Sequence, residues 1–424
     1  MAYVMASDTK LKTQLGSEIG KLEGVILHQP GSEVQNMTPQ NAERALYSDI
    51  LNLSVAGEEY KKFNKVLNKF TKTFQVKSLL TDILSDESTK RNLVSRICAQ
   101  EDAADKIYPL LELENAELAR QLIEGVVMVK DTLTKFLDPN RYSLRPLHNF
   151  FFTRDASVAI SDEILICKMA NDVRDREAVI MEAIFDHHHF FDTTTVNPRK
   201  KGYYGNNITI EGGDVLVIRE DILLVGSSAR TTSQGIDYIL DELLVSKKKR
   251  YLIVQEMPHK PESFIHLDMA FTMLDEDKCM IFEPLITRPN KFQTVQIEID
   301  NGKVKKISNV KDIMEALKNL GMDLEPVLCG GNNDQWVQER EQWHSGANFF
   351  AIGPGKVIGY ERNNYTIEEM NKHGFEILTA DQVINDKVNM DYYKKFVVTI
   401  PGSELARGGG GCRCMTMPIR RKKI

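Results

Sequence analysis

From Leu147 onward, short strand-like runs alternate with helical runs, and this alternation limits the possible folds more than any other feature. Residues 157–169 and 214–225 each resemble a β-hairpin, and a helix-like run at 236–247 precedes a strand-like run at 250–255. The alternation continues through residues 278–282, 294–299, 310–320, 348–352 and 356–360. Repeated strand pairs with single helices predict an α/β repeat architecture such as an α/β propeller. The runs have no strict period, so the number of blades stays open.

The N-terminal third is organised differently. Residues 23–36 predict a strand that ends in a turn at Pro30 and Gly31, residues 45–72 a helix, and residues 74–80 a strand. Residues 81–137 are helix-rich and contain no glycine before Gly125. Apolar residues recur there at helical spacing, at Leu110, Leu111, Leu113, Leu118 and Leu122. This tract predicts a small helical bundle inserted into the α/β fold.

Composition excludes several classes of protein. The chain has 424 residues and a formal net charge of -6, which argues against a nucleic-acid-binding protein. Its start has no signal-peptide pattern, and no apolar run is long enough to span a bilayer. The six scattered cysteines are typical of reduced thiols in a cytoplasmic protein. Two short basic clusters, at residues 247–250 and 420–423, are interpreted as solvated surface.

Two acidic segments could carry chemistry. FFTRDAS places Arg154 and Asp155 after an aromatic run, which on its own is more typical of a solvated ion pair at a strand end. EGGD puts Glu211 and Asp214 around two glycines, just before an apolar strand. This sequence suits a turn, but the glycines would also let a ligand approach two converging carboxylates.

Two histidine-containing segments are weaker signals. In HLDM, an extended backbone would put His266 and Asp268 on one face, where they could bind a metal or transfer protons. A lone histidine beside apolar residues is more often structural. The run His187 to His189 has poor spacing for a metal site, and we interpret it as the end of the helix that begins near Arg176.

The segment GGGGCRCMTMP, residues 408–418, contains two cysteines behind four glycines. It could be a surface linker, although a compact apolar segment rarely follows one. Glycines also let backbone amides and a nucleophile come close to a substrate. The motifs together supply one thiol, one histidine and several carboxylates, in the order Asp155, Glu211, Asp214, His266, Asp268 and Cys414. So many carboxylates suit a cationic substrate, and a guanidinium matches them in bidentate fashion.

Over essentially its full length the sequence resembles the arginine deiminase family of the guanidino-group-modifying superfamily. The matching stretches are LHQPGSE, NFFFTRD, RDRE, EGGD, GSSARTT, HLDM, LCGG, REQWHSGANFFAIGPGKVIGYERN and SELARGGGGCRCMTMPI. The resemblance implies a five-bladed pseudosymmetric ββαβ propeller with an inserted helical domain. The expected domains are residues 1–78 and 146–424 for the discontinuous catalytic propeller and residues 79–145 for the insertion.

The resemblance also implies an activity, hydrolysis of L-arginine to L-citrulline and ammonia without metal or organic cofactor, as the first step of arginine catabolism. Such an enzyme is a hydrolase that acts on the C–N bonds of amidines. It is cytoplasmic, commonly a homo-oligomer (dimer or tetramer), and has no nucleic-acid or membrane partner.

Individual roles follow from the matching positions. Cys414 matches a nucleophile that forms a covalent amidino (thiouronium) intermediate, and His266 matches the general acid–base. Asp155 and Asp268 match carboxylates that hold the guanidinium, with Glu211 beside His266. Residues expected around the amino-acid end of the substrate are Asn149, Arg174, Asp214, Arg230 and Gly408. Only one thiol is needed, so Cys412 is expected to pack against or line the loop.

Some positions depart from the family pattern, and other functions stay open. Gly409 stands where many relatives carry a second arginine that helps to hold the substrate carboxylate, and Ala229 stands where an acidic residue is frequent. Arg413 precedes the nucleophile, where relatives have histidine or arginine. An amidinotransferase or another guanidine hydrolase would share these groups, and a non-catalytic arginine-binding protein could keep the scaffold. A zinc hydrolase built on residues 187–189 is a weaker alternative.

Overall fold

The computed structural model describes residues 10–38, 49–202, 207–332 and 334–424. Within these residues, one strand-pairing pattern recurs in five sheets: an antiparallel pair of strands, and then a further strand parallel to the second strand of the pair. In the first such sheet, β22 (Met417–Arg421) pairs with β2 (Leu22–Leu27), and β3 (Lys72–Gln75) lies parallel to β2. Helix α3 (Leu53–Phe70) connects β2 to β3. The predicted α/β class is confirmed.

The other sheets repeat this arrangement along the chain. The second contains β6 (Ser157–Ile160), β7 (Glu163–Ile166) and β9 (Thr194–Val196), with α9 (Asp175–His187) before β9. The third contains β10 (Val215–Arg219), β11 (Ile222–Ser227) and β12 (Arg250–Glu256), with α10 (Ser233–Val245) before β12, and is extended by β15 (Thr294–Asp300) and β16 (Lys303–Val310). The fourth contains β13 (Phe271–Met273), β14 (Lys278–Ile281) and β17 (Glu325–Leu328), with α12 (Ile313–Asn319) before β17. The fifth contains β18 (Phe350–Gly353), β19 (Lys356–Tyr360), β20 (Glu376–Thr379) and β21 (Phe396–Ile400), with α14 (Asn364–Lys372) before β20.

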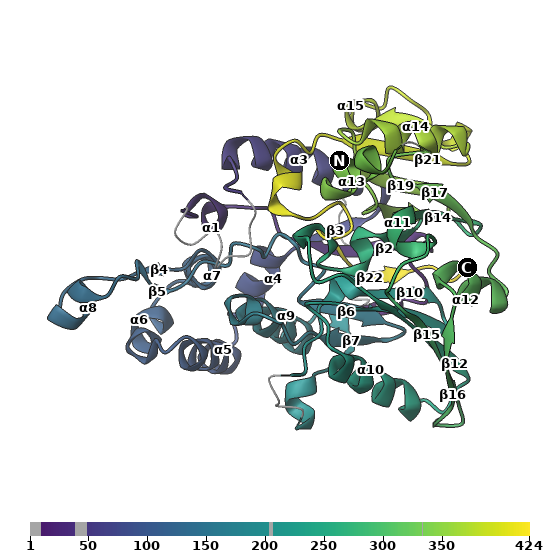
Figure 1. Cartoon of the computed structure of the whole chain (residues 1–424). Coiled ribbons are helices and arrows are strands. Elements are labelled where there is room, and N and C mark those ends of the chain that lie inside the picture. The colour runs from purple at the N-terminus through teal and green to yellow at the C-terminus, as the bar shows by residue number, and fades with distance from the viewer. Residues whose placement is uncertain (1–9, 39–48, 203–206, 333) are drawn as a thin grey trace.

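The predicted helical tract packs on α9, the helix of the second sheet, through α4 (Val76–Ile83) and α5 (Glu87–Gln100). It also contains α6 (Ile107–Leu111), α7 (Asn115–Glu124) and α8 (Leu133–Leu137). These helices gather on one side of the sheets, and α8 lies at their far end with the short pair β4 (Val126–Val127) and β5 (Tyr142–Leu144) (Figure 1). One buried apolar cluster contains Leu93 of α5 and Leu118 of α7 together with Ile180 of α9. The tract therefore shares a core with the α/β part.

Two expectations from the sequence need correction. Residues 74–80 are not a strand, because β3 ends at Gln75 and α4 begins at Val76. Val76, Leu79, Leu80 and Ile83 are buried at helical spacing, so a helix buries more apolar surface than a strand would. The helix predicted for residues 45–72 is described from Leu53 to Phe70, and residues 45–48 lie outside the described chain.

The cluster at residues 420–423 is not uniformly solvated surface either. Arg421 is buried in β22 and donates hydrogen bonds to the carbonyl oxygens of Gly20 (2.8 Å) and Ala351 (2.7 Å). Arg420, the preceding residue on the strand, pairs with Glu23 (2.8 Å) on the partly exposed face. Because successive side chains of a strand point to opposite faces of the sheet, Arg421 is buried while its neighbour Arg420 is partly exposed.

The histidine run lies at a helix end, as predicted. Helix α9 ends at His187, and His188 donates its amide to the carbonyl of Ile184. Among the residues that the structure describes, no helix combines the length and apolarity needed to cross a membrane.

Candidate active site

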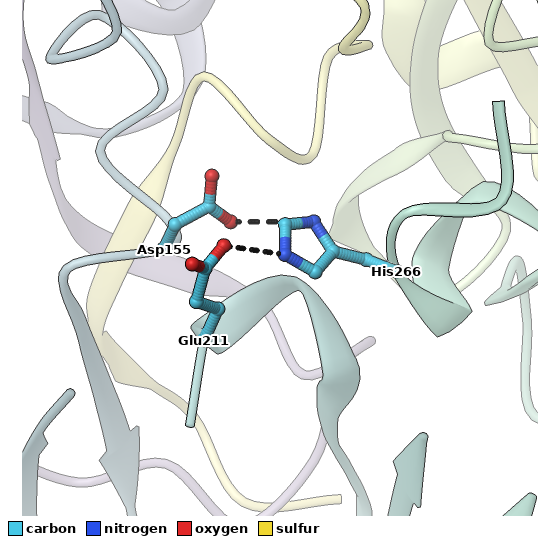
Figure 2. Close-up of side chains that lie close together, drawn as sticks. All are labelled: Asp155, Glu211 and His266. Atoms are coloured by element: carbon cyan, nitrogen blue, oxygen red, sulfur yellow. Dashed lines mark hydrogen bonds and ion pairs between the residues drawn. The ribbon is translucent and has the colours of Figure 1, made fainter. Parts of the chain in front are cut away.

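Three buried side chains from different segments meet at the centre of the site (Figure 2). Nε2 of His266 lies 2.9 Å from Oε2 of Glu211, and Nδ1 lies 3.7 Å from Oδ1 of Asp155. Glu211 precedes the 3₁₀ turn Gly212–Asp214 that leads into β10, and Asp155 lies two residues before β6. The backbone of Gly213 runs so close to the imidazole that a Cβ there would lie 2.4 Å from Nδ1. This tight turn brings the histidine against both carboxylates.

The charges around His266 favour its protonated form. Burial disfavours the imidazolium, but the charge of Asp155 and the hydrogen bond to Glu211 outweigh burial and raise the pKa of His266 to about 9. Burial acts against the charged form of Glu211 too and would raise its pKa. The nearby Arg230, His266 and Arg174 outweigh burial and lower the pKa of Glu211 to about 2. At neutral pH the pair is therefore an imidazolium with a carboxylate.

HLDM is not extended, so the condition under which His266 and Asp268 would share one face is not met. His266 has an extended backbone, but Leu267–Met269 form a 3₁₀ turn. The His266 and Asp268 side chains consequently make different contacts. His266 meets Glu211, whereas Oδ2 of Asp268 accepts from Nη1 of Arg413 (2.9 Å) and lies 3.6 Å from Sγ of Cys414.

Cys414 lies in the loop before β22 and is 3% exposed. Its backbone carbonyl accepts from the amide of Arg154 (3.1 Å), and its amide donates to Oδ1 of Asn348 (3.3 Å). Phe152 packs on the glycine run, where a Cβ at Gly410 would lie 2.5 Å from its ring. The glycines therefore form a closely packed turn rather than a surface linker. Burial, Asp268 and Asp155 raise the pKa of the Cys414 thiol well above its usual value.

A cavity brings most of the predicted residues together. Its lining includes Asn149, Asp155, Arg174, Arg230, His266, Gly408 and Cys414, and also Gly409, whose φ of +86° is left-handed. Glu211 and Asp268 lie behind this lining, in contact with His266 and Cys414. Asp214 is also outside it: its carboxylate accepts from the amide of Leu267 (2.8 Å) and the hydroxyl of Ser228 (2.6 Å). Asp214 therefore does not line this cavity.

The solvated Arg154–Asp155 pair expected from the sequence is not formed, because both residues are buried and face different partners. Nε of Arg154 donates to the carbonyl of Arg413 (3.4 Å) and Nη2 to the hydroxyl of Thr416 (3.3 Å). Oδ2 of Asp155 instead accepts from Nη1 of Arg174 (2.8 Å). Among the described residues, Oδ1 of Asp155 has no hydrogen-bond partner although it is buried. A buried carboxylate oxygen that accepts no hydrogen bond lowers the stability of the protein, and it suits a cationic ligand that can donate one.

The two arginines of the cavity differ in their partners. Arg174 donates to Asp155 and to both oxygens of Glu177, at 3.2 Å from Nε and 2.8 Å from Nη2. Arg230 is more exposed, and its Nη1 lies 3.7 Å from Glu211. Within the described part of the chain, the Arg230 guanidinium thus has fewer close partners than that of Arg174, which suits it to receive a ligand anion.

Asp155, Glu211 and His266 could also be considered as metal ligands, because one atom of each lies within 4.8 Å of the others. Arg174 and Arg230 already neutralise two of these groups at 2.8 Å and 3.7 Å. The raised pKa of His266 keeps its ring protonated, and a protonated imidazole does not ligate a metal ion, whereas Oδ1 of Asp155 can still accept a hydrogen bond from an organic cation.

Several residues that shape the site were assigned no function from the sequence. Glu177 holds Arg174, and Asn348 links two loops by accepting from the amides of Arg413 and Cys414 and donating to the carbonyl of Asp268 (3.1 Å). Glu177 and Asn348 occur within the motifs RDRE and GANFF. Glu18, which pairs with Arg413, has no comparable sequence signal.

The described residues thus combine an α/β fold with a buried site in which a cysteine, a histidine and several carboxylates converge. Solved structures share the fold. The N-terminal domain of ArgZ, an arginine dihydrolase from cyanobacteria, aligns with a TM-score of 0.51 at 12% identity, over 94% of this chain and 97% of that chain. SxtG, an amidinotransferase from Microseira wollei, aligns with a TM-score of 0.52 at 14% identity, over 97% of this chain and 98% of that chain.

Sequence comparison is more specific. The profile of the arginine deiminase family matches residues 43–421. The arginine deiminase of Bacillus cereus (strain B4264) is 34% identical over 96% of this chain and 98% of its own length. That of Bacillus thuringiensis subsp. konkukian (strain 97-27) is 33% identical over the same shares. The chain belongs to the arginine deiminase family.

Proposed function

We propose that this chain hydrolyses L-arginine to L-citrulline and ammonia through a covalent amidino-cysteine (thiouronium) intermediate, as the first step of arginine catabolism. The observation that carries the proposal is the buried Oδ1 of Asp155, which accepts no hydrogen bond from the described residues and lies 3.7 Å from Nδ1 of His266, in a cavity that also holds Cys414. A guanidinium placed there gives Asp155 its missing donor and puts its carbon beside the thiol.

The carboxylates hold the reacting end of the substrate. Asp155 and Asp268 accept from the guanidinium nitrogens, and the two negative charges balance the cation as its carbon becomes tetrahedral. Arg230 and Arg174 bind the α-carboxylate of the substrate, and Glu177 holds Arg174 in the orientation for this. Asn149 and Gly408 lie beside the amino-acid end. Gly409 adds no side-chain donor. Asp214 supports the His266 turn through Leu267 rather than touching the substrate.

The reaction divides into two steps. The Cys414 thiolate attacks the guanidinium carbon, a C–S bond forms, and the C–N bond to the leaving nitrogen breaks as His266 donates the proton that makes ammonia. Water then attacks the same carbon with His266 as the base, a C–O bond forms, the C–S bond breaks, and citrulline leaves. Glu211 holds the imidazole in place throughout, 2.9 Å from Nε2.

The buried thiol is poorly ionised in the empty site, because burial and two nearby carboxylates raise its pKa. The arriving guanidinium cation reverses part of that effect by neutralising Asp155 and Asp268. Binding and activation are coupled in this way.

Mass spectrometry of the intact protein, acid-quenched within seconds of mixing with L-arginine, tests the proposal alongside a citrulline assay. One amidino group on the peptide containing Cys414, with citrulline and ammonia formed from arginine alone, supports it. Transfer of the amidino group only when an amine is added would indicate an amidinotransferase. Neither adduct nor citrulline would indicate another guanidine substrate or a binding protein.

We also propose the molecular organisation. The five repeated sheets support a five-bladed ββαβ propeller formed by residues 1–78 and 146–424, with residues 79–145 as the helical insertion. Exposed apolar side chains on the β4–α8–β5 arm support a homo-oligomer. The six cysteines are all free, which suits the reducing cytoplasm.

A further inference from the structure

A buried ion pair lies directly behind Asp268 and Cys414. Nε and Nη2 of Arg413 donate to the two carboxylate oxygens of Glu18, at 2.9 Å and 3.1 Å. Nη2 also donates to the carbonyl of Val215 (2.8 Å), and Nη1 donates to Oδ2 of Asp268 (2.9 Å). Glu18 is 6% exposed and Arg413 is 1% exposed. The guanidinium is thus fixed in one orientation by three partners.

This arrangement fixes the carboxylate of Asp268. One of its oxygens is held by Arg413, and the two oxygens lie 3.6 Å and 3.9 Å from Sγ of Cys414. Because Arg413 cannot turn while Glu18 and Val215 hold it, Asp268 cannot rotate away from the thiol. Glu18 does not line the cavity, so any effect on a substrate passes through Arg413.

The charges of the three side chains explain why a carboxylate stands at residue 18. Alone beside Asp268, the Arg413 cation would neutralise the charge that must attract a guanidinium. Glu18 balances Arg413 from the opposite side, since opposite charges at this distance interact strongly in a buried site. Taken alone, the Glu18–Arg413–Asp268 row carries one negative unit next to the thiol. The buried guanidiniums of Arg154 and Arg421 also lie near this row and, with Arg413, lower the pKa of Glu18 against the effect of burial.

We propose that Glu18 is a positioning residue for the proposed reaction: through Arg413 it fixes the carboxylate of Asp268 beside Cys414 and preserves its negative charge for the substrate cation. The inference rests on the proposed function and extends it to a segment between β1 (Leu11–Lys12) and β2, far from the catalytic motifs in sequence.

The test uses Glu18→Gln, with Glu341→Gln as the matched control. Glu341 is also 6% exposed, and it accepts from the amides of Tyr365 (2.9 Å) and Thr366 (2.7 Å), away from the cavity. We expect Glu18→Gln to lower kcat/KM for L-arginine by about tenfold or more, mainly through KM, because small misplacements of a binding group are costly. Glu341→Gln should lower the melting temperature and leave KM unchanged.

A second readout is independent of turnover. The pH dependence of Cys414 alkylation by iodoacetamide, followed by peptide mass spectrometry, reports the ionisation of the thiol. The charged and titratable groups around this thiol are Asp155, Asp268, Arg413, His266 and Tyr360. Removing the Glu18 charge leaves Arg413 unbalanced, so the alkylation profile of Glu18→Gln should move to lower pH while its kcat/KM falls. A purely structural role would move neither the profile nor KM.

Arg413→Lys separates charge from geometry. Lysine keeps the positive charge but cannot reach Asp268, Glu18 and Val215 together, so kcat/KM should fall while the alkylation profile stays near that of the wild type. The inference is overturned if Glu18→Gln keeps the kcat/KM of the wild type. If Glu18→Gln does not fold, the same result in Arg413→Lys overturns it. A wild-type protein that makes no citrulline refutes the proposed function instead, and the alkylation profiles still decide whether Glu18 acts on Cys414.

Discussion

The two cysteines of the C-terminal loop are both buried but differ in their neighbours. Both belong to one apolar cluster, but Cys414 also faces Asp268 and the cavity, whereas Cys412 is fully buried and does not line the cavity. Cys414→Ser should lower citrulline formation by at least about 10³-fold, because a serine hydroxyl is a far weaker nucleophile here. Cys412→Ser should keep most of the activity and lose about 1–3 kcal/mol of stability, since it buries a hydroxyl group. Loss of turnover in Cys412→Ser but not in Cys414→Ser would contradict both assignments.

His266 and Glu211 should make stability depend on pH in a defined window. The raised pKa of His266 contributes stability that is fully present below its ordinary value of 6.5 and is lost as pH rises through about 9. The lowered pKa of Glu211 contributes stability that is fully present above 4.5 and is lost as pH falls through about 2. Urea unfolding from pH 5 to 10 should therefore show a decline above pH 6.5 that is smaller in Glu211→Gln.

In the same variant, histidine NMR should show His266 losing its proton at lower pH, and turnover should fall about 10²–10⁴-fold because proton transfer is impaired. An unchanged His266 titration would show that Glu211 does not set the charge of the ring.

At the scale of the element, one glycine turn positions His266. A Cβ at Gly213 would lie 2.4 Å from Nδ1 of His266, whereas a Cβ at Gly57, in the middle of α3, meets nothing within 4 Å. Gly213→Ala should displace the imidazole and lower kcat by about 10²-fold. Gly57→Ala should keep the activity and raise the free energy of unfolding by about 0.5–1 kcal/mol, as alanine favours a helix. Equal activity in the two variants would contradict the role given to this turn.

Elements were predictable where local pattern decides them. Alternation predicts the hairpins at residues 157–169 and 214–225, and helical spacing predicts the helix that the structure shows as α10. All three elements are present. The strand predicted at 74–80 was wrong because its apolar residues fit a helix better. The sequence of HLDM left its backbone open, and the structure places Asp268 in a 3₁₀ turn.

The motifs named most of the residues that line the cavity. They could not reveal Glu18, whose effect depends on a contact between residues 395 positions apart. Local sequence also could not show that Arg154 and Asp155 turn away from each other, because tertiary packing determines their partners.

At the scale of the whole molecule, the helical tract ends in an arm whose surface is unusually apolar. Leu133, Phe136 and Leu137 of α8 are 74%, 70% and 69% exposed, and Val127 and Val129 beside them are 55% and 62% exposed. The arm projects away from the sheets (Figure 1). Clustered exposed apolar side chains on a projecting element are typical of a protein–protein interface. We expect a second copy of this chain to cover them.

Phe136→Glu combined with Leu137→Glu should therefore lower the oligomeric mass, measured by size-exclusion chromatography with light scattering at micromolar concentration. The new charges would have to be desolvated at the interface, and a buried unpaired charge is strongly unfavourable. Trp336→Glu is the control, because Trp336 is 84% exposed on α13 (Gln335–Trp343), far from the arm in sequence. Its mass should equal that of the wild type. A monomeric wild-type protein, or an unchanged mass in the double variant, would show that the arm is not the interface. Since the arm contributes no residue to the cavity, kcat in the double variant should change little even if the oligomer dissociates.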